Sequence, residues 1–202
     1  MKLYYSPAAC SLAPHIALRE AGIDVELVKT DVKEKKTATG ADFWQINSKG
    51  YVPTLQLDNG QVLTECPVIL QYVADLKPAS GLAPAAGTME RYRLQEWLNF
   101  ITSEVHKSMG TFFNPGCTEA WKDGVAAYLS RRLDWLAPQL DGKQYLMGTY
   151  SVADAYLFTV LNWGQFVSFD IGRWPSLKAF QERVGARPKV QEALMAEGLV
   201  KH

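Results

Sequence analysis

Residues 2–30 decide the fold class of this chain, and they read KLYYSPAACSLAPHIALREAGIDVELVKT. The short aromatic segment 2–6 and the β-branched segment 25–30 are typical of strands, whereas apolar residues recur at helical spacing across 12–21. Gly22 follows that helix directly, at the left-handed C′ position that favours glycine. Two strands joined by a helix form a parallel pair with a right-handed crossover. The stretch therefore predicts an α/β domain.

The following residues complete this domain. A helical turn is expected at 42–46, and two short strands at 52–57 and 61–64 flank Asp58-Asn59-Gly60. An Asn-Gly pair between short strands is a strong hairpin signal. An apolar helix over 66–76 ends the domain, so the predicted order is βαβαββα.

Composition changes over residues 77–88, where proline, glycine and alanine predominate, as in a linker. Beyond it the chain predicts helices, and Ser151-Val152-Ala153-Asp154 has the form of an N-terminal capping box whose usual role is structural. The predicted organisation is an α/β domain over 1–77, a linker over 78–88 and an all-helical domain over 89–202. Further helices are predicted at 94–105, 125–136, 175–184 and 188–196.

Composition excludes several classes of protein. The 202 residues hold 21 basic and 21 acidic side chains, so no net positive field attracts nucleic acid or an anionic membrane. A hydrophobic content of 48% excludes intrinsic disorder. The N-terminus lacks the apolar region of a signal peptide, and no apolar run approaches 18 residues, so we expect a cytoplasmic protein. Three cysteines without a C-x-x-C pair predict neither a disulfide framework nor a zinc site.

Cys10 is the first candidate for chemistry. Pro14 would clash with the carbonyl of Cys10 if the helix already ran through that residue, so the helix should begin near Ser11, a good N-cap residue. Cys10 then lies at a helix N-terminus, where unpaired N–H groups and the macrodipole favour a thiolate. The alternative is a buried, inert cysteine, and the residues alone leave both open.

Two further sites follow in the same domain. Pro53 either opens an edge strand in trans or forms a cis bond that exposes the Val52 backbone to a peptide-like ligand. At the passage from strand to helix, the backbone N–H of Cys66 could bind a carboxylate and Glu65 an ammonium. The alternative is that Glu65 is an ordinary acidic residue in a first helical turn.

The first long helix after the linker carries a polar stripe. Asn99, Ser103, His106 and Lys107 lie on roughly one face, beside the apolar residues. Such a stripe is usually solvated, but His106 is one of only three histidines and could hydrogen-bond a thiolate. The histidines are too few, and no carboxylates pair at ligand spacing, so we expect no metal site.

Together these motifs resemble the cytosolic glutathione S-transferases over essentially the whole chain. The resemblance rests on residues 6–10, Val52-Pro53, Glu65-Cys66 before an apolar helix, and the box at 151–154. Cys10 with His106 is similar to the bacterial beta class in particular. The resemblance implies a thioredoxin-like N-terminal domain, an all-helical C-terminal domain and a homodimer.

The resemblance also implies a binding site for glutathione. Pro53 would be cis, and the Val52 backbone would pair with the cysteinyl part of glutathione. Glu65 and Cys66 would hold the γ-glutamyl end, and Lys35 would approach the glycine carboxylate. Residues of the helical domain would line the site, some of them across a dimer interface: Asn99, Ser103, Glu104 and His106.

The implied reaction is attack of the glutathione thiolate on a small hydrophobic electrophile, with no metal and with glutathione as co-substrate. Cys10 and His106 are the expected catalytic residues, and Tyr5 is a weaker candidate because other classes place a catalytic tyrosine there. Dehalogenation of aromatic compounds is a hypothesis about the substrate. The alternatives are a glutaredoxin-like thiol–disulfide oxidoreductase acting through Cys10 and a non-catalytic glutathione-binding module.

One residue departs from the family pattern. Many members have a serine after the glutamate where this chain has Cys66, so the resemblance implies the backbone contact with glutathione but not the contact of a side-chain hydroxyl. We expect Cys66 to act through its backbone rather than in redox chemistry, and Cys117 has no assigned role. An apolar wall for the electrophile, or else simply core, is expected from four aromatic residues: Phe112, Phe113, Trp163 and Phe166.

Overall fold

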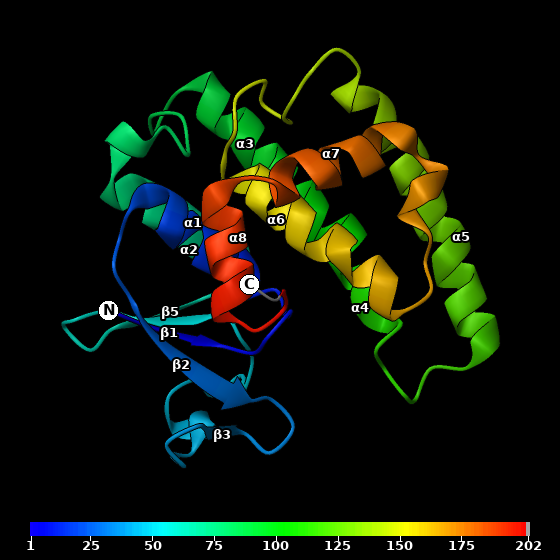
Figure 1. The fold of residues 1–202 in the computed structure, drawn as a ribbon. Helices are drawn as coiled ribbons and strands as arrows, with labels where there is room; N and C mark the ends of the chain where they lie inside the picture. Colours follow the sequence, from blue (N-terminus) through cyan, green and yellow to red (C-terminus); the bar gives the residue numbers. More distant parts are fainter. Residues whose placement is uncertain (201–202) are drawn as a thin grey trace. The chain divides into compact units, whose positions relative to one another are not determined.

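The computed structural model describes residues 1–200, which divide into two compact units (Figure 1). The first unit comprises residues 1–83 together with the C-terminal segment that begins at Arg187. The second unit comprises Pro84–Ala186. Within residues 1–200, no helix is long and apolar enough to cross a membrane.

A five-stranded sheet in the order β3-β2-β1-β4-β5 forms the centre of the first unit. β1 pairs in parallel with β2, as the opening stretch predicts, and all other pairs are antiparallel. The predicted hairpin is formed by β4 and β5, but the two-residue β3 was not predicted. The strand bounds are β1 Lys2–Tyr5, β2 Glu26–Asp31, β3 Lys36–Thr37, β4 Thr54–Gln56 and β5 Val62–Thr64.

Helices α1 (Leu12–Ala21) and α2 (Cys66–Leu76) pack against each other in the first unit, and their bounds are as predicted. Gly22 ends α1 in the left-handed conformation at φ 62°. The predicted turn at 42–46 is a short 3₁₀ helix, η1 (Phe43–Gln45). A second 3₁₀ turn, η2 (Pro78–Ser80), lies in the predicted linker.

Helix α8 (Pro188–Ala196) departs from the predicted division of the chain. It lies beside α1 within the first unit, whereas the sequence predicts that all residues from 89 onward belong to the helical domain (Figure 1). Its apolar face is buried through Val190, Ala193 and Leu194. Helical periodicity reports only that one face is buried, so it does not identify the core that covers this face.

The second unit is helical, and α6 (Val152–Leu161) is buried along its whole length. Leucines of α5, at residues 129, 133 and 136, add to the core. The remaining bounds are α3 Met89–Phe100, η3 Ile101–His106, α4 Lys107–Thr111, α5 Glu119–Leu136, η4 Ala137–Leu140, η5 Asn162–Phe166, η6 Ile171–Arg173 and α7 Pro175–Gly185.

The segment η3 is π-helical and interrupts what the sequence predicts as one continuous helix over 94–105. A π turn advances the chain by more residues than an α turn, so it changes which side chains share a face. Ile101 and Val105 remain buried, while His106 stands at the last π-helical position. Single π turns in α-helices are frequent at functional sites.

The capping box at the start of α6 is present as predicted. The Asp154 carboxylate is fully buried and accepts hydrogen bonds from the Leu146 N–H at 2.9 Å, the Ser151 N–H at 2.8 Å and the Ser151 hydroxyl at 3.0 Å. Burial raises the pKa of Asp154 to about 6, against the lowering effect of these donors. The box therefore ties the preceding loop to the most buried helix of the unit.

Candidate active site

Cys10 lies in the turn directly before α1, and its thiol donates a hydrogen bond to the Val52 carbonyl at 3.2 Å. The sequence predicts Ser11 as the N-cap of α1, but the Ser11 side chain makes no capping hydrogen bond. An N-cap side chain bonds the N–H of the second or third helical residue. Here the Ala13 N–H already donates to the Cys10 carbonyl at 3.1 Å, and Pro14 has no N–H.

The Ser11 side chain instead closes the loop that carries Cys10. Its hydroxyl accepts from the Ser6 N–H and donates to the Ser6 carbonyl, both at 3.2 Å. The Ala8 N–H donates to Glu197 at 3.1 Å, and Glu197 pairs with the fully buried His15 at 2.9 Å. Sequence reasoning missed this support because Glu197 is distant along the chain.

The Val52–Pro53 peptide bond is cis, as the resemblance implies and as base rates alone would not predict. The hydrogen bond between Cys10 and the Val52 carbonyl therefore lies just before the start of β4.

Glu65 stands between β5 and α2 with a φ of 69°, which is unusual for a residue other than glycine. Backbone strain of this kind gathers at ligand sites. Its carboxylate pairs with Lys49 at 2.6 Å, and Lys49 also donates to the Thr64 hydroxyl at 3.1 Å. Sequence reasoning missed Lys49, which lies 16 residues earlier in a loop without any motif.

Cys66 is buried at the start of α2, and its thiol donates to the Cys10 carbonyl at 3.6 Å. Burial, with the nearby Cys10 and Glu65, raises the pKa of Cys66 well above its ordinary value. The side chain is therefore a protonated thiol that braces the turn of Cys10.

Lys35 has a left-handed backbone at φ 54° and donates to the Gly50 carbonyl at 2.8 Å. Its ammonium also lies over the rings of Trp44 and Tyr51, at 5.3 and 5.5 Å from their centroids. This cation is thus held near the loop that leads into Val52.

Tyr5 lies at the end of β1 with its side chain largely buried. Burial and the negative charge of Glu197 raise the pKa of Tyr5, so the phenol stays neutral. A neutral phenol can donate a hydrogen bond, but it is not a base.

The predicted residues of the helical unit gather on α3 and η3. The Ser103 hydroxyl donates to the Asn99 carbonyl at 3.0 Å. Glu104 pairs with Arg132 at 3.1 Å and accepts a short hydrogen bond from the Tyr128 hydroxyl. The charge of Glu104 is thus held by residues of α5.

His106 is partly buried, and its Nδ1 atom lies 2.5 Å from the hydroxyl of Tyr156. The imidazole also meets Trp163 edge to face, with ring centroids 4.9 Å apart. Sequence reasoning identified His106 but missed Tyr156, whose position inside an apolar helix predicts only core packing.

Comparison with known proteins relates both units to one family. The model of the glutathione S-transferase N-terminal domain matches residues 1–75, and that of the C-terminal domain matches residues 106–188. The chain belongs to the glutathione S-transferase family. Glutathione S-transferase GstA of Escherichia coli O157:H7 is 43% identical over 200 residues, which cover 98% of this chain and all of the relative.

Solved structures place this transferase among bacterial members of the family. The ternary complex of BphK, a bacterial transferase, superposes with a TM-score of 0.97 at 58% identity, over 98% of this chain and 100% of that one. A bacterial beta-class transferase of Sphingomonas chungbukensis gives a TM-score of 0.96 at 47% identity, over 99% and 100%. The expected family, class and two-part fold are confirmed.

The aromatic residues of the transferase's helical unit fall into two groups. Phe113 packs edge to face on Trp163, with centroids 5.8 Å apart, whereas Phe112 packs on Phe169 at 5.9 Å. Phe113 and Phe166 are about half exposed and Trp163 is buried. Phe113 and Trp163 therefore extend the aromatic contacts of His106, while Phe112 belongs to a separate contact.

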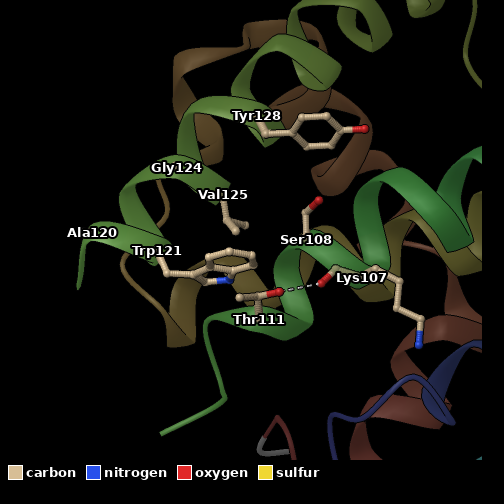
Figure 2. Close-up of a pocket in the computed structure, with 8 residues that line it drawn as sticks. All are labelled: Lys107, Ser108, Thr111, Ala120, Trp121, Gly124, Val125 and Tyr128. Carbon is tan, nitrogen blue, oxygen red and sulfur yellow. Dashed lines mark hydrogen bonds between the residues drawn. The ribbon is translucent and has the colours of Figure 1, made fainter. Parts of the chain in front are cut away.

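A groove of about 400 Å³ lies between α4 and α5 of the helical unit, and Trp121 and Val125 line it (Figure 2). Lys107 lines it through its backbone, whose carbonyl accepts from Thr111 at 3.0 Å, while its amino group points away. None of the four aromatic residues expected to hold the electrophile lines this groove. Among residues 1–200, no cluster of side chains could hold a metal ion.

Proposed function

We propose that this glutathione S-transferase joins the thiolate of glutathione to small hydrophobic electrophiles. The observation that carries the proposal is the bond from the Cys10 thiol to the Val52 carbonyl, next to the cis bond before Pro53. A thiol and the backbone before the cis bond thus meet in one unit, and Lys35, Glu65 and Cys66 belong to the same unit. Glutathione is the co-substrate, as both family domains imply.

Each part of the tripeptide has a complementary group in this arrangement. The Val52 backbone pairs with the cysteinyl part, and Glu65 accepts from the γ-glutamyl ammonium. The N–H of Cys66, at the start of α2, donates to the γ-glutamyl carboxylate. Lys35 attracts the carboxylate of the glycine.

In the reaction, the glutathione sulfur forms a bond to an electrophilic carbon. A halide leaves with the bonding pair, or an activated alkene takes up a proton after addition. His106 donates a hydrogen bond that stabilises the thiolate, and the Cys10 thiol donates a second one when it gives up its bond to the Val52 carbonyl. The protein otherwise orients the two reactants, and Phe113 with Trp163 offers an apolar surface to an aromatic electrophile.

We propose further that the active form is a homodimer in the cytoplasm, with Asn99, Ser103 and Glu104 serving glutathione at or across the dimer interface. Met89 and Tyr92 support an interface, since they lie three residues apart on α3 and are both more than half exposed in the single chain.

Cys10→Ala is expected to separate two activities of the protein. Conjugation of a chlorinated nitroaromatic should keep at least about a third of its rate, because other donors still stabilise the thiolate. Reduction of a mixed disulfide by glutathione should fall to its uncatalysed rate, because catalysed exchange would proceed through the Cys10 thiol. Both rates are measured on one preparation, with Cys117→Ala as control. If wild type exchanges disulfides but conjugates nothing, the chain is an oxidoreductase.

The roles of Tyr5 and His106 are expected to differ. Tyr5→Phe should change kcat/KM for conjugation less than threefold, because the proposal assigns the hydrogen bonds to the sulfur to Cys10 and His106. His106→Ala should lower it about tenfold to a hundredfold, by loss of a hydrogen bond to a charged sulfur. Steady-state kinetics at several pH values measures both. A larger loss for Tyr5→Phe than for His106→Ala would assign the catalytic donor to Tyr5.

A further inference from the structure

The hydroxyl of Tyr156 occupies a fully buried position in the middle of α6, and its ring has no exposed surface. A buried hydroxyl needs hydrogen-bond partners, because burial without them costs free energy. Two are present on η3: His106 Nδ1 at 2.5 Å and the Thr102 hydroxyl at 3.4 Å. Tyr156 thus joins the most buried helix of the unit to the π-helical turn.

The distances at Thr102 and His106 favour one direction for these hydrogen bonds. Thr102 has one hydroxyl proton, and it donates this proton to the Leu98 carbonyl at 2.7 Å. The Tyr156 proton therefore favours the much closer His106 Nδ1 over the Thr102 oxygen. If Nδ1 accepts a hydrogen bond, the proton of the neutral imidazole is on Nε2.

We propose that Tyr156 is a positioning residue that fixes the neutral tautomer of His106 with its proton on Nε2. The tautomer itself is independent of the proposed function, whereas its role in catalysis rests on that function. In this tautomer His106 presents Nε2–H as the donor to the glutathione sulfur, while Trp163 holds the ring edge to face. The π-helical turn matters because it places Thr102 and His106 together against Tyr156.

The first test reads the tautomer directly, without glutathione. The ring nitrogens of ¹⁵N-histidine-labelled protein are observed by NMR above the titration range of histidine, and His106→Asn assigns the signals among the three histidines. Wild type should show the Nε2–H tautomer of His106, and Tyr156→Phe should populate both tautomers. The Nδ1–H tautomer in wild type, or an unchanged tautomer in Tyr156→Phe, would overturn the proposal.

The matched control is Thr102→Val, which removes the other hydroxyl beside Tyr156 but leaves the bond to His106. It should retain the Nε2–H tautomer. Loss of that tautomer in Thr102→Val would show that general packing, rather than the Tyr156 hydroxyl, sets it. If Tyr156→Phe does not fold, the wild-type and Thr102→Val spectra still decide the direction of the hydrogen bond.

The second test asks whether Tyr156 acts through His106 in turnover. Tyr156→Phe should lower kcat about threefold to tenfold, leave KM for glutathione within twofold and move the acid limb of the pH profile upward. Combined with His106→Ala it should add nothing further, because the two residues form one unit. Additive losses would contradict the proposal. A wild type that conjugates nothing would refute the proposed function and leave the NMR result standing.

Discussion

Glu65→Gln should raise KM for glutathione by about tenfold to a hundredfold while kcat stays within about threefold. A hydrogen bond between charged groups contributes about 1.5–3 kcal/mol, and glutamine keeps the shape of the side chain without its charge. The loss falls on KM because the γ-glutamyl ammonium is remote from the reacting sulfur, so it binds equally in ground and transition states. Initial rates over a range of glutathione concentrations measure the effect.

Two control variants accompany Glu65→Gln. Lys49→Met removes the partner of Glu65 in an exposed ion pair, which contributes little, so KM should stay within about threefold. Glu34→Gln removes an exposed carboxylate elsewhere in the same unit and should change nothing. If Glu65→Gln has the KM of wild type, the γ-glutamyl end of glutathione is bound elsewhere.

Asp154→Ala is expected to lower the free energy of unfolding by about 3 kcal/mol or more. The substitution leaves the Leu146 N–H and the Ser151 N–H and hydroxyl without their acceptor in a buried place, at about 1–3 kcal/mol for each unsatisfied group. Chemical denaturation followed by circular dichroism measures the change.

Ser151→Ala is the control for that variant, because it removes only one donor to Asp154 and should cost about 1 kcal/mol, as a lost N-cap does. Equal losses in the two variants would mean that the helix cap, rather than the buried carboxylate, stabilises the unit. A loss below 1 kcal/mol for Asp154→Ala would contradict the account of the box.

The sequence predicted correctly those helices and strands whose ends are marked by glycine or by a turn motif. Gly22 and the strand-like segments flanking 12–21 defined the first β-α-β unit, and the Asn-Gly turn defined the hairpin. The two-residue β3 is too short for any periodicity. The π-helical segment η3 could not be predicted from the sequence either, because apolar residues at spacings of 3 and 4 fit an α-helix equally well.

The site residues likewise divide into those that a local sequence signal predicts and those that it does not. Cys10, Pro53 and Glu65 stand at element boundaries, where a single residue type has a specific meaning. Lys49 and Tyr156 were not predicted as site residues, because only the structure shows their contacts with Glu65 and His106, which are distant in sequence. Ser11 had the right residue type for a helix cap, but Pro14 removed the N–H that such a cap would bond.

The central claim is that this chain catalyses conjugation of glutathione. The most direct measurement is the initial rate of conjugation of a chlorinated nitroaromatic by the purified protein as glutathione is increased. We expect the rate to saturate with glutathione and one chloride to be released for each conjugate formed. A rate no higher than the uncatalysed reaction, together with efficient reduction of mixed disulfides, would contradict the claim.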